Sequence, residues 1–382
     1  MNKYQVTALI VLFLSPFFSA LADDGKSEFN PLIYGVPSLT IAPDARAGGM
    51  GDVGAATEPD IFSQHWNPAK YAFSYSKAGI GLSYTPWLRS LVSDIDLAYL
   101  AGFYKLGDAD RHAVGASLRY FSLGEIEMRD RNDDIISNAK PYELAFDVSY
   151  SLKFTETFSG AATFRYIYSD LGTQEEDLEP ASAWAADVAG YYNNYVMVGN
   201  SECLLGLGFN ISNIGTKISY DGNTTKNFLP TNMRLGGSLL YPMDDYNTIS
   251  FNLDVSKYLI PATPETKDLT EDERKELLEE YYDISPISGI FKSFEQFSVD
   301  DLMFSFGAEY AYDNKFFVRG GYFHESEKKG NRRYFTAGAG FKLTAFQLDA
   351  AYLISTVPSN PLDQTIRFTL SFDMDGLKNL MR

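Results

Sequence analysis

The chain has 382 residues, of which 45% are hydrophobic, 15% aromatic and 21% charged, and this composition excludes an intrinsically disordered protein. Past the N-terminus, no stretch provides the roughly 20 apolar residues of a transmembrane helix, which excludes a helical membrane protein. The net charge of -18 would repel nucleic-acid phosphates. The single cysteine, Cys203, can form neither an internal disulfide nor a thiolate metal site by itself.

The first residues predict a secretory signal peptide over residues 1–22. Lys3 precedes an apolar run that extends from Ala8 to Phe18, and the small residues Ala20 and Ala22 follow. A charged start, a short apolar run and a small-x-small exit are typical of export signals. A short buried strand or helix is the alternative. No cysteine follows the run, so the sequence predicts no lipid anchor.

Residues 23–76 are predicted to form an N-terminal segment that plugs the interior of the barrel described below. From residue 38 onward this segment is rich in glycine and alanine and lacks the alternation seen later. Gly49, Gly51 and Gly54 match G-x-G-x-x-G, but no strand precedes them and no βαβ unit follows, so no dinucleotide cofactor is expected. Glycines would instead allow the plug backbone to approach the barrel wall closely.

From residue 77 to 374 the chain alternates apolar and polar residues, as in Ile249, Phe251 and Leu253, which are separated by Ser250 and Asn252. This period of two predicts strands with two different faces. The sixth and seventh segments are the least certain, because the asparagines at 193–194 fit either a turn or a bulge within a longer strand. Fourteen strands are predicted, over residues 78–85, 93–106, 112–122, 141–153, 157–169, 182–192, 202–213, 231–242, 247–257, 302–312, 315–324, 332–343, 345–355 and 364–374.

Two regularities predict the fold class. Most segments have about 10 to 13 residues, the length with which a tilted strand crosses a bilayer. The links after even-numbered strands are short and those after odd-numbered strands are mostly longer, which matches the periplasmic turns and external loops of outer-membrane barrels. We therefore predict an all-β membrane protein, a 14-stranded antiparallel transmembrane β-barrel over 77–374, with residues 375–382 as a periplasmic tail.

Strand parity assigns one face of the predicted barrel to its lumen, and this face carries charges of both signs. These charges either pack the barrel around its plug or line a conduction path. Small residues on the same face would leave room for the plug. The predicted lumen residues are Arg119, Arg165, Arg234, Arg319, Arg367, Asp147, Asp254, Glu309 and Asp349, with Gly115, Gly236, Gly338 and Gly340 beside them.

The connection over residues 258–300 is predicted to be a long extracellular loop with two short helices. The sequence 270–273 (TEDE) reads as a capping box that opens the first helix, and the second follows Pro286. Their apolar residues would pack on each other and on the barrel rim, dock a partner or cargo, or collect a hydrophobic ligand. The candidate partner-binding residues are Leu277, Tyr281, Ile290, Phe291 and Phe294.

Metal and catalytic motifs are weak in this sequence. His65, His112 and His324 lack the helical spacing of zinc ligands, so no metal site is predicted. Asp130 and Asp134 have calcium-loop spacing, but the turn glycine and the bidentate glutamate of such a loop are missing. There is no G-x-S-x-G motif, although a Ser-His-Asp set could still assemble across strands. No catalytic residue and no cofactor is assigned.

Residues 41–54 (IAPDARAGGMGDVG), followed by 66–70 (WNPAK), resemble the N-terminal signature of the PorV family. These proteins are outer-membrane barrels of the type IX secretion system in Bacteroidota and are part of the wider FadL-like group of fourteen-stranded barrels. FadL-like proteins similarly carry an Asn-Pro-Ala segment in a plug. The resemblance therefore identifies a plug motif made of Arg46, Gly48, Gly49, Gly51, Trp66, Asn67 and Pro68.

The resemblance implies a non-enzymatic component of protein export in the outer membrane of a Bacteroidota-like bacterium. Its implied partners are the large translocon barrel, cargo proteins with a C-terminal signal domain, and a cell-surface attachment complex with a sortase-like protease. Outer-membrane lipids and lipopolysaccharide would also contact it, whereas nucleic acid would not. Two alternatives stay open: a FadL-like channel for hydrophobic small molecules, and a lipid A O-deacylase.

Overall fold

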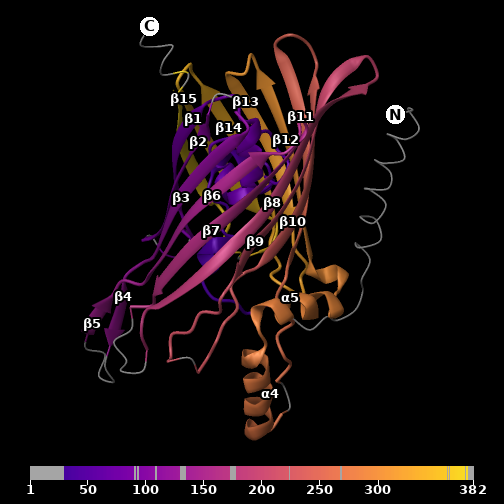
Figure 1. Cartoon of the computed structure of the whole chain (residues 1–382). Helices are drawn as coiled ribbons and strands as arrows, with labels where there is room; N and C mark the ends of the chain where they lie inside the picture. The colour runs from indigo at the N-terminus through magenta and orange to yellow at the C-terminus, as the bar shows by residue number, and fades with distance from the viewer. Residues whose placement is uncertain are drawn as a thin grey trace.

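The computed structural model describes residues 30–374 and 376, except for 90–91, 93, 108–109, 130–134, 173–177, 223, 267–268, 359 and 361. The predicted signal peptide, the calcium-like spacing and nearly all of the predicted C-terminal tail lie outside the described residues. Fourteen antiparallel strands form a closed barrel (Figure 1). Each strand pairs with its neighbour in sequence, and the barrel closes between β1 and β16 from Gly79 opposite Asp373 to Tyr84 opposite Phe368.

The barrel strands agree closely with the predicted segments. They alternate buried and exposed residues along most of their length, because one face packs on the interior and the other faces outward. Their bounds are β1 Ala78–Pro86, β2 Ile95–Leu106, β3 His112–Leu123, β6 Tyr142–Lys153, β7 Phe158–Asp170, β8 Ala181–Val198, β9 Ser201–Gly215, β10 Asn232–Pro242, β11 Asn247–Tyr258, β12 Leu302–Tyr312, β13 Phe316–His324, β14 Arg333–Lys342, β15 Phe346–Ser355 and β16 Ile366–Asp373.

Two features differ from the sequence-based prediction. The predicted end of the sixth strand at residue 192 is wrong, because β8 continues to Val198 with Asn193 opposite Gly206 and Asn194 opposite Leu205. The chain reverses only at Gly199, whose φ of 64° suits a tight turn. The prediction also missed a separate hairpin of β4 (Ile126–Arg129) and β5 (Ile135–Ala139), which lies in the connection between β3 and β6.

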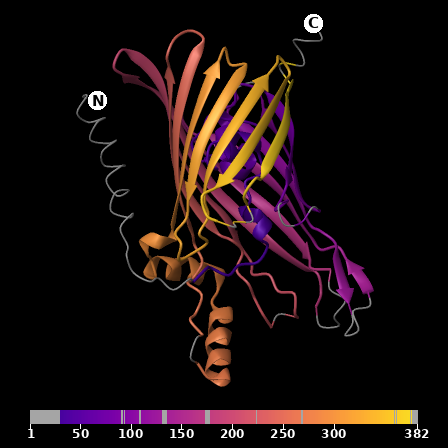
Figure 2. The same cartoon turned by 180° about the vertical axis from the view of Figure 1, so that it is seen from behind.

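The two ends of the barrel differ. Short turns join β2 to β3, β6 to β7 and β8 to β9 at the end where β16 also finishes. The hairpin and the helices α4 (Glu271–Asp283) and α5 (Pro286–Glu295) lie at the opposite end, with the 3-10 helix η3 (Val299–Asp301) leading into β12 (Figures 1 and 2). This asymmetry is that of an outer-membrane barrel, whose longer loops face outward from the cell.

The outer surface of the barrel is covered by exposed apolar side chains. Such a continuous apolar surface suits lipid rather than water. Within the described residues, no helix is long and apolar enough to cross a membrane. The exposed apolar residues include one from each barrel strand: Leu82, Leu100, Leu118, Phe146, Phe164, Val188, Leu207, Leu235, Phe251, Tyr310, Val318, Phe335, Leu348 and Phe368.

Residues 36–74 lie inside the barrel, as the indigo segment in Figures 1 and 2 shows. They form four short helical turns, η1 (Pro37–Thr40), α2 (Ala45–Gly48), α3 (Ser63–Trp66) and η2 (Pro68–Phe73), and most of their side chains are buried. Helix α2 lies against β14, β15 and β16, whereas η2 lies against β6, β7 and β8. The segment therefore contacts opposite sides of the barrel wall and fills the space between them. We call residues 36–74 the plug.

Candidate functional site

An ion-pair chain crosses from the plug to three strands. Arg46, on α2, contacts Asp60 of the plug and Glu309 of β12, each at 3.0 Å. Arg319 of β13 continues the chain, with 2.6 Å to Glu309 and 2.6 Å to Asp349 of β15. The five groups alternate in charge, so each is compensated within the interior. The sequence predicted Arg46 as a plug residue and the other wall residues as lumen charges, and the structure brings them together.

A second group of contacts fixes the glycine-rich turn of the plug. Asp254 of β11 accepts hydrogen bonds from the backbone N–H of Gly54 and Ala55, at 2.8 and 3.0 Å. Asp52 receives a hydrogen bond from the Tyr334 hydroxyl at 2.6 Å and an ion pair from Arg367 at 2.9 Å. The interior carboxylates therefore bind backbone amides and guanidinium groups of the plug and the wall.

A third group lies on the other side of the barrel. Arg165 of β7 forms ion pairs with Asp147 of β6 and Asp187 of β8, at 3.0 and 2.9 Å. Gln64 of the plug donates a hydrogen bond to Asp147 at 2.7 Å and accepts one from Ser149 at 2.6 Å. The lumen charges predicted from strand parity are thus used to pack the barrel around its plug, which is one of the two functions that the sequence left open.

The plug glycines lie where a side chain would collide with the wall. Gly51 has a φ of 69°, and a Cβ there would lie 2.6 Å from the carbonyl oxygen of Tyr322. The Gly49 and Gly338 backbones meet so closely that a Cβ on Gly49 would lie 3.0 Å from the Gly338 Cα. Gly48 lies directly against the Arg367 side chain. Close backbone approach therefore explains the glycine-rich sequence.

Trp66, Asn67 and Pro68 form the second half of the plug motif and are buried. The Trp66 indole donates a hydrogen bond to Asp44 at 2.6 Å. The Asn67 side chain donates to the carbonyls of Ala55 and Gly190, at 2.8 and 3.0 Å, and accepts a hydrogen bond from Ala69 N–H. Asn67 thus joins the two halves of the plug and ties them to β8, which is a structural role.

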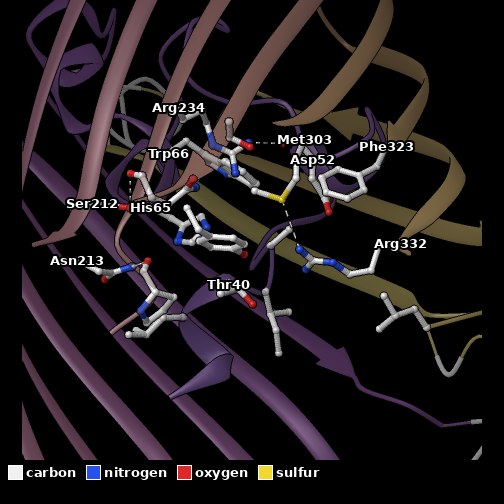
Figure 3. Close-up of a pocket in the computed structure, with 18 of the residues that line it drawn as sticks. Thr40, Asp52, His65, Trp66, Ser212, Asn213, Arg234, Met303, Phe323 and Arg332 are labelled. Atoms are coloured by element: carbon white, nitrogen blue, oxygen red, sulfur yellow. Dashed lines mark hydrogen bonds between the residues drawn. The ribbon is translucent and has the colours of Figure 1, made fainter. Parts of the chain in front are cut away.

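A cavity of about 130 Å³ remains between the plug and the long-loop end of the barrel (Figure 3). Its lining combines aromatic groups, such as Trp66 and Phe323, with the cations of Arg234 and Arg332. Arg234 stacks on Trp66 with 4.8 Å to the ring centroid, and Arg332 pairs with Glu325 at 2.7 Å. Arg332 also reaches the sulfur of Met303, as the dashed line in Figure 3 shows. The cavity can accommodate a small molecule with both apolar and polar groups.

Helix α4 begins with the predicted capping box, in which Thr270 and Glu273 bind each other's backbone N–H groups. Its only fully buried residue is Tyr281, near its end, which packs edge-on against Phe228 at 5.6 Å between ring centroids. Burial raises the pKa of the Tyr281 hydroxyl to about 12. Leu277 lies halfway along the helix and is half-buried. Tyr281 is therefore a structural anchor, in contrast to its predicted role as a partner-binding residue.

Helix α5, in contrast to α4, buries small residues and leaves large apolar residues exposed. It buries its small residues Gly289 and Ser293, a packing face that the pattern of large apolar residues does not predict. Phe291 and Phe294 are 65% and 47% exposed, and Ile290 is half-buried. The small size of Gly289, which lies against Phe228 and Pro261, was the available signal.

The three histidines lie on three different elements, His65 on α3, His112 on β3 and His324 on β13. His65 contacts Arg119 at 3.1 Å, His112 contacts the Tyr150 hydroxyl and His324 contacts the Tyr322 hydroxyl. In the described part of the chain, no cluster of three or more histidine, cysteine or acidic residues could hold a metal ion.

Several solved structures share this fold. The toluene transporter TodX of Pseudomonas putida matches with 12% identity and a TM-score of 0.50, covering 90% of this chain and 99% of that chain. A second TodX structure has 12% identity and a TM-score of 0.51, covering 87% and 97%. A FadL homologue of Pseudomonas aeruginosa has 11% identity and a TM-score of 0.44, covering 90% and 99%. The TodX likeness establishes the fold alone.

Sequence comparison gives the family. No curated protein sequence matches this chain significantly. The model of the family described as type IX secretion system protein PorV matches residues 25–266, which is more than half of the chain. This span includes the plug and the barrel strands from β1 to β11. The chain therefore belongs to the PorV family and is an outer-membrane β-barrel component of the type IX secretion system.

Proposed function

We propose that this protein binds secreted cargo through its C-terminal signal domain at the translocon and delivers it to the cell-surface attachment machinery. The main support for the proposal is the family match over residues 25–266. The plug that fills most of the barrel interior supports it further. The proposed partners are the large translocon barrel, the cargo and an attachment complex with a sortase-like protease, in the outer membrane of a Bacteroidota-like bacterium.

The filled interior supports a function outside the lumen. Ion pairs and hydrogen bonds connect the plug to strands on opposite sides of the barrel. The remaining cavity of about 130 Å³ is similar to the cavity of about 150 Å³ that holds one benzene. No polypeptide can pass through such a space. A role in protein export therefore depends on the outward-facing loops.

Helix α4 is the part of these loops that best fits a docking element. It projects away from the barrel (Figure 1), and most of its 13 residues are exposed. An isolated helix of this length is marginally stable in water, so a partner that covers it would stabilise it. Its half-buried Leu277 and Leu278 are surrounded by acidic residues, which suits a cargo surface with an apolar centre and basic rim.

The test replaces both leucines, Leu277→Ser with Leu278→Ser, in cells that export cargo. The matched control is Lys275→Ser with Glu279→Ser, which removes a surface ion pair from the same helix without changing its net charge. We expect cargo with an uncleaved C-terminal domain to accumulate in the leucine variant and not in the control. Both barrels should stay folded, as shown by their shifted migration in unheated gel samples. Full cargo processing in the leucine variant would refute α4 as the docking element.

The second candidate is a FadL-like channel for hydrophobic small molecules, and the cavity favours it. Asn67 connects the plug to β8, so its substitution by alanine should loosen the plug and change the uptake of a hydrophobic substrate. Unchanged uptake would count against the channel. The lipid A O-deacylase alternative has less support, since the three histidines contact arginine, tyrosine and tryptophan side chains.

A further inference from the structure

Helix α5 has three distinct sides. Its buried side consists of Gly289 and Ser293, which face the barrel rim. About 150° around the helix axis from these two residues lie Ile287, Phe291 and Phe294, which are 58%, 65% and 47% exposed. The apolar side of this helix therefore points away from the side that contacts the protein.

The third side of α5 is polar and consists of Ser288, Lys292 and Glu295, all of which are exposed. Soluble proteins rarely leave aromatic residues clustered in water on one side of a helix. A helix that lies in a membrane interface has this arrangement, with one apolar side toward the acyl chains and one polar side toward water.

The segment that follows α5 lies over the membrane-facing side of β11. Leu253, Val255 and Lys257 share the outward parity of this strand, yet Lys257 is only 3% exposed. Its Nζ lies 3.4 Å from Asp301 and 6.0 Å from the centre of the Phe297 ring, so the segment after α5 covers it. The chain that leaves α5 therefore lies on the outward side of the barrel wall, next to its lipid-facing surface.

The position of α5 relative to the barrel agrees with a location at the membrane surface. It lies crosswise to the strands at the long-loop end, and it extends sideways beyond the barrel wall, whereas α4 projects away along the barrel axis (Figures 1 and 2). A helix that extends beside the wall at this level lies over the surface of the surrounding bilayer.

We propose that α5 is an interfacial helix of the outer leaflet, with Ile287, Phe291 and Phe294 inserted among the acyl chains. This anchor fixes the root of the loop at the level of the membrane surface and leaves α4 free above it. It assigns Phe291 and Phe294 to lipid contact in place of the partner contact predicted from sequence. The proposal does not depend on the function of α4.

The test measures nitroxide spin labels on purified full-length protein in phosphatidylcholine nanodiscs, without any protein partner. Labels are placed by Phe291→Cys on the apolar side and by Ser288→Cys and Glu295→Cys on the polar side, with Phe251→Cys on the barrel as the lipid reference. Cys203 is fully buried, and labelling of the unsubstituted chain shows whether it reacts. Power saturation then gives the accessibility of each label to oxygen, which partitions into lipid, and to a water-soluble nickel chelate.

We expect the oxygen-to-nickel ratio at Phe291→Cys to be several-fold higher than at Ser288→Cys and Glu295→Cys and to approach that of Phe251→Cys, which lies deeper in the bilayer. A ratio at Phe291→Cys equal to those of the polar-side labels would overturn the proposal and leave this side free for a protein. Low accessibility to both reagents would also overturn it, because the label would then be buried in the protein. Neither result bears on cargo processing through α4, so the two proposals fail separately.

Discussion

The plug lies inside the barrel and the α4–α5 loop lies at its outer end, and the two segments are stabilised in opposite ways. The plug is buried, and its charged groups pair with strands far away in sequence, as Arg46 does with Glu309 across 263 residues. The loop has a few anchors, Tyr281 and Asp301 among them, and leaves several of its large apolar side chains exposed. The difference indicates that the interior of this barrel serves stability, whereas its outer end provides surfaces for other molecules.

Substitution of a buried ion-pair residue should have the largest effect. Arg319→Ala leaves Asp349 without its cation and removes one of the two arginines that compensate Glu309. Breaking a buried pair costs about 3–5 kcal/mol, so the urea midpoint of unfolding in detergent micelles should fall markedly. The control Lys315→Ala removes an exposed ion pair at the turn before β13 and should change little. Equal midpoints for both variants would mean that the plug is not held by its charges.

Adding a methyl group to the plug by Gly51→Ala should have the next largest effect on stability. Gly51 and Gly107 both have a φ of 69°, but a Cβ at Gly51 would lie within 2.7 Å of the Tyr322 and Phe306 backbones, whereas nothing lies within 4 Å at Gly107. Both alanine variants incur the left-handed backbone cost of about 1–2 kcal/mol. Gly51→Ala adds an overpacking cost of about 1–3 kcal/mol. Chemical unfolding of the two variants checks the difference, and identical stabilities would contradict close plug packing.

The smallest effect is expected at the loop anchor Asp301. Burial alone would raise the pKa of its carboxyl, but the Ser298 N–H and the ammonium groups of Lys329 and Lys257 lower it below its ordinary value. The ionised group therefore stabilises the anchor above about pH 4, the ordinary aspartate range, and this stabilisation is lost as the pH falls through the lowered pKa. A spin label at Val299→Cys should become more mobile on acidification.

The Asp301→Asn variant should have high label mobility at every pH, because its side chain carries no charge. Asp300→Asn is the matched control, because Asp300 lies beside Asp301 in η3 and pairs with a different lysine, Lys328. If the Asp301→Asn variant keeps the pH response of the parent, another acid controls the anchor.

The barrel could be predicted from sequence because its signal is local. Alternation along Ile249, Phe251 and Leu253 needs only one strand with two different faces, and the lengths of the links need only a count. The hairpin of β4 and β5 was missed because its strands are short and form a separate sheet outside the barrel. The end of β8 stayed open in the sequence because asparagines at 193–194 fit either a turn or a bulge within a longer strand, and pairing with β9 decided for the longer strand.

The candidate site was predictable only in part. Arg46, Gly51 and Asn67 were recognised as plug residues, but their roles depend on partners that are hundreds of residues away or on another strand. The aromatic pattern of α5 was visible in the sequence, whereas the packing of Gly289 and Ser293 was not, because small residues carry no periodic apolar signal.

The sequence by itself determined the strand number, the lumen-facing parity and the location of the loop helices, since each follows from the order of neighbouring residues. Only the tertiary structure decided which charges compensate one another, because closing the barrel brings Arg46, Glu309, Arg319 and Asp349 together. It also decided which side of α5 is covered. An amphipathic pattern shows that a side is apolar, but what that side contacts depends on where the rest of the chain places the helix.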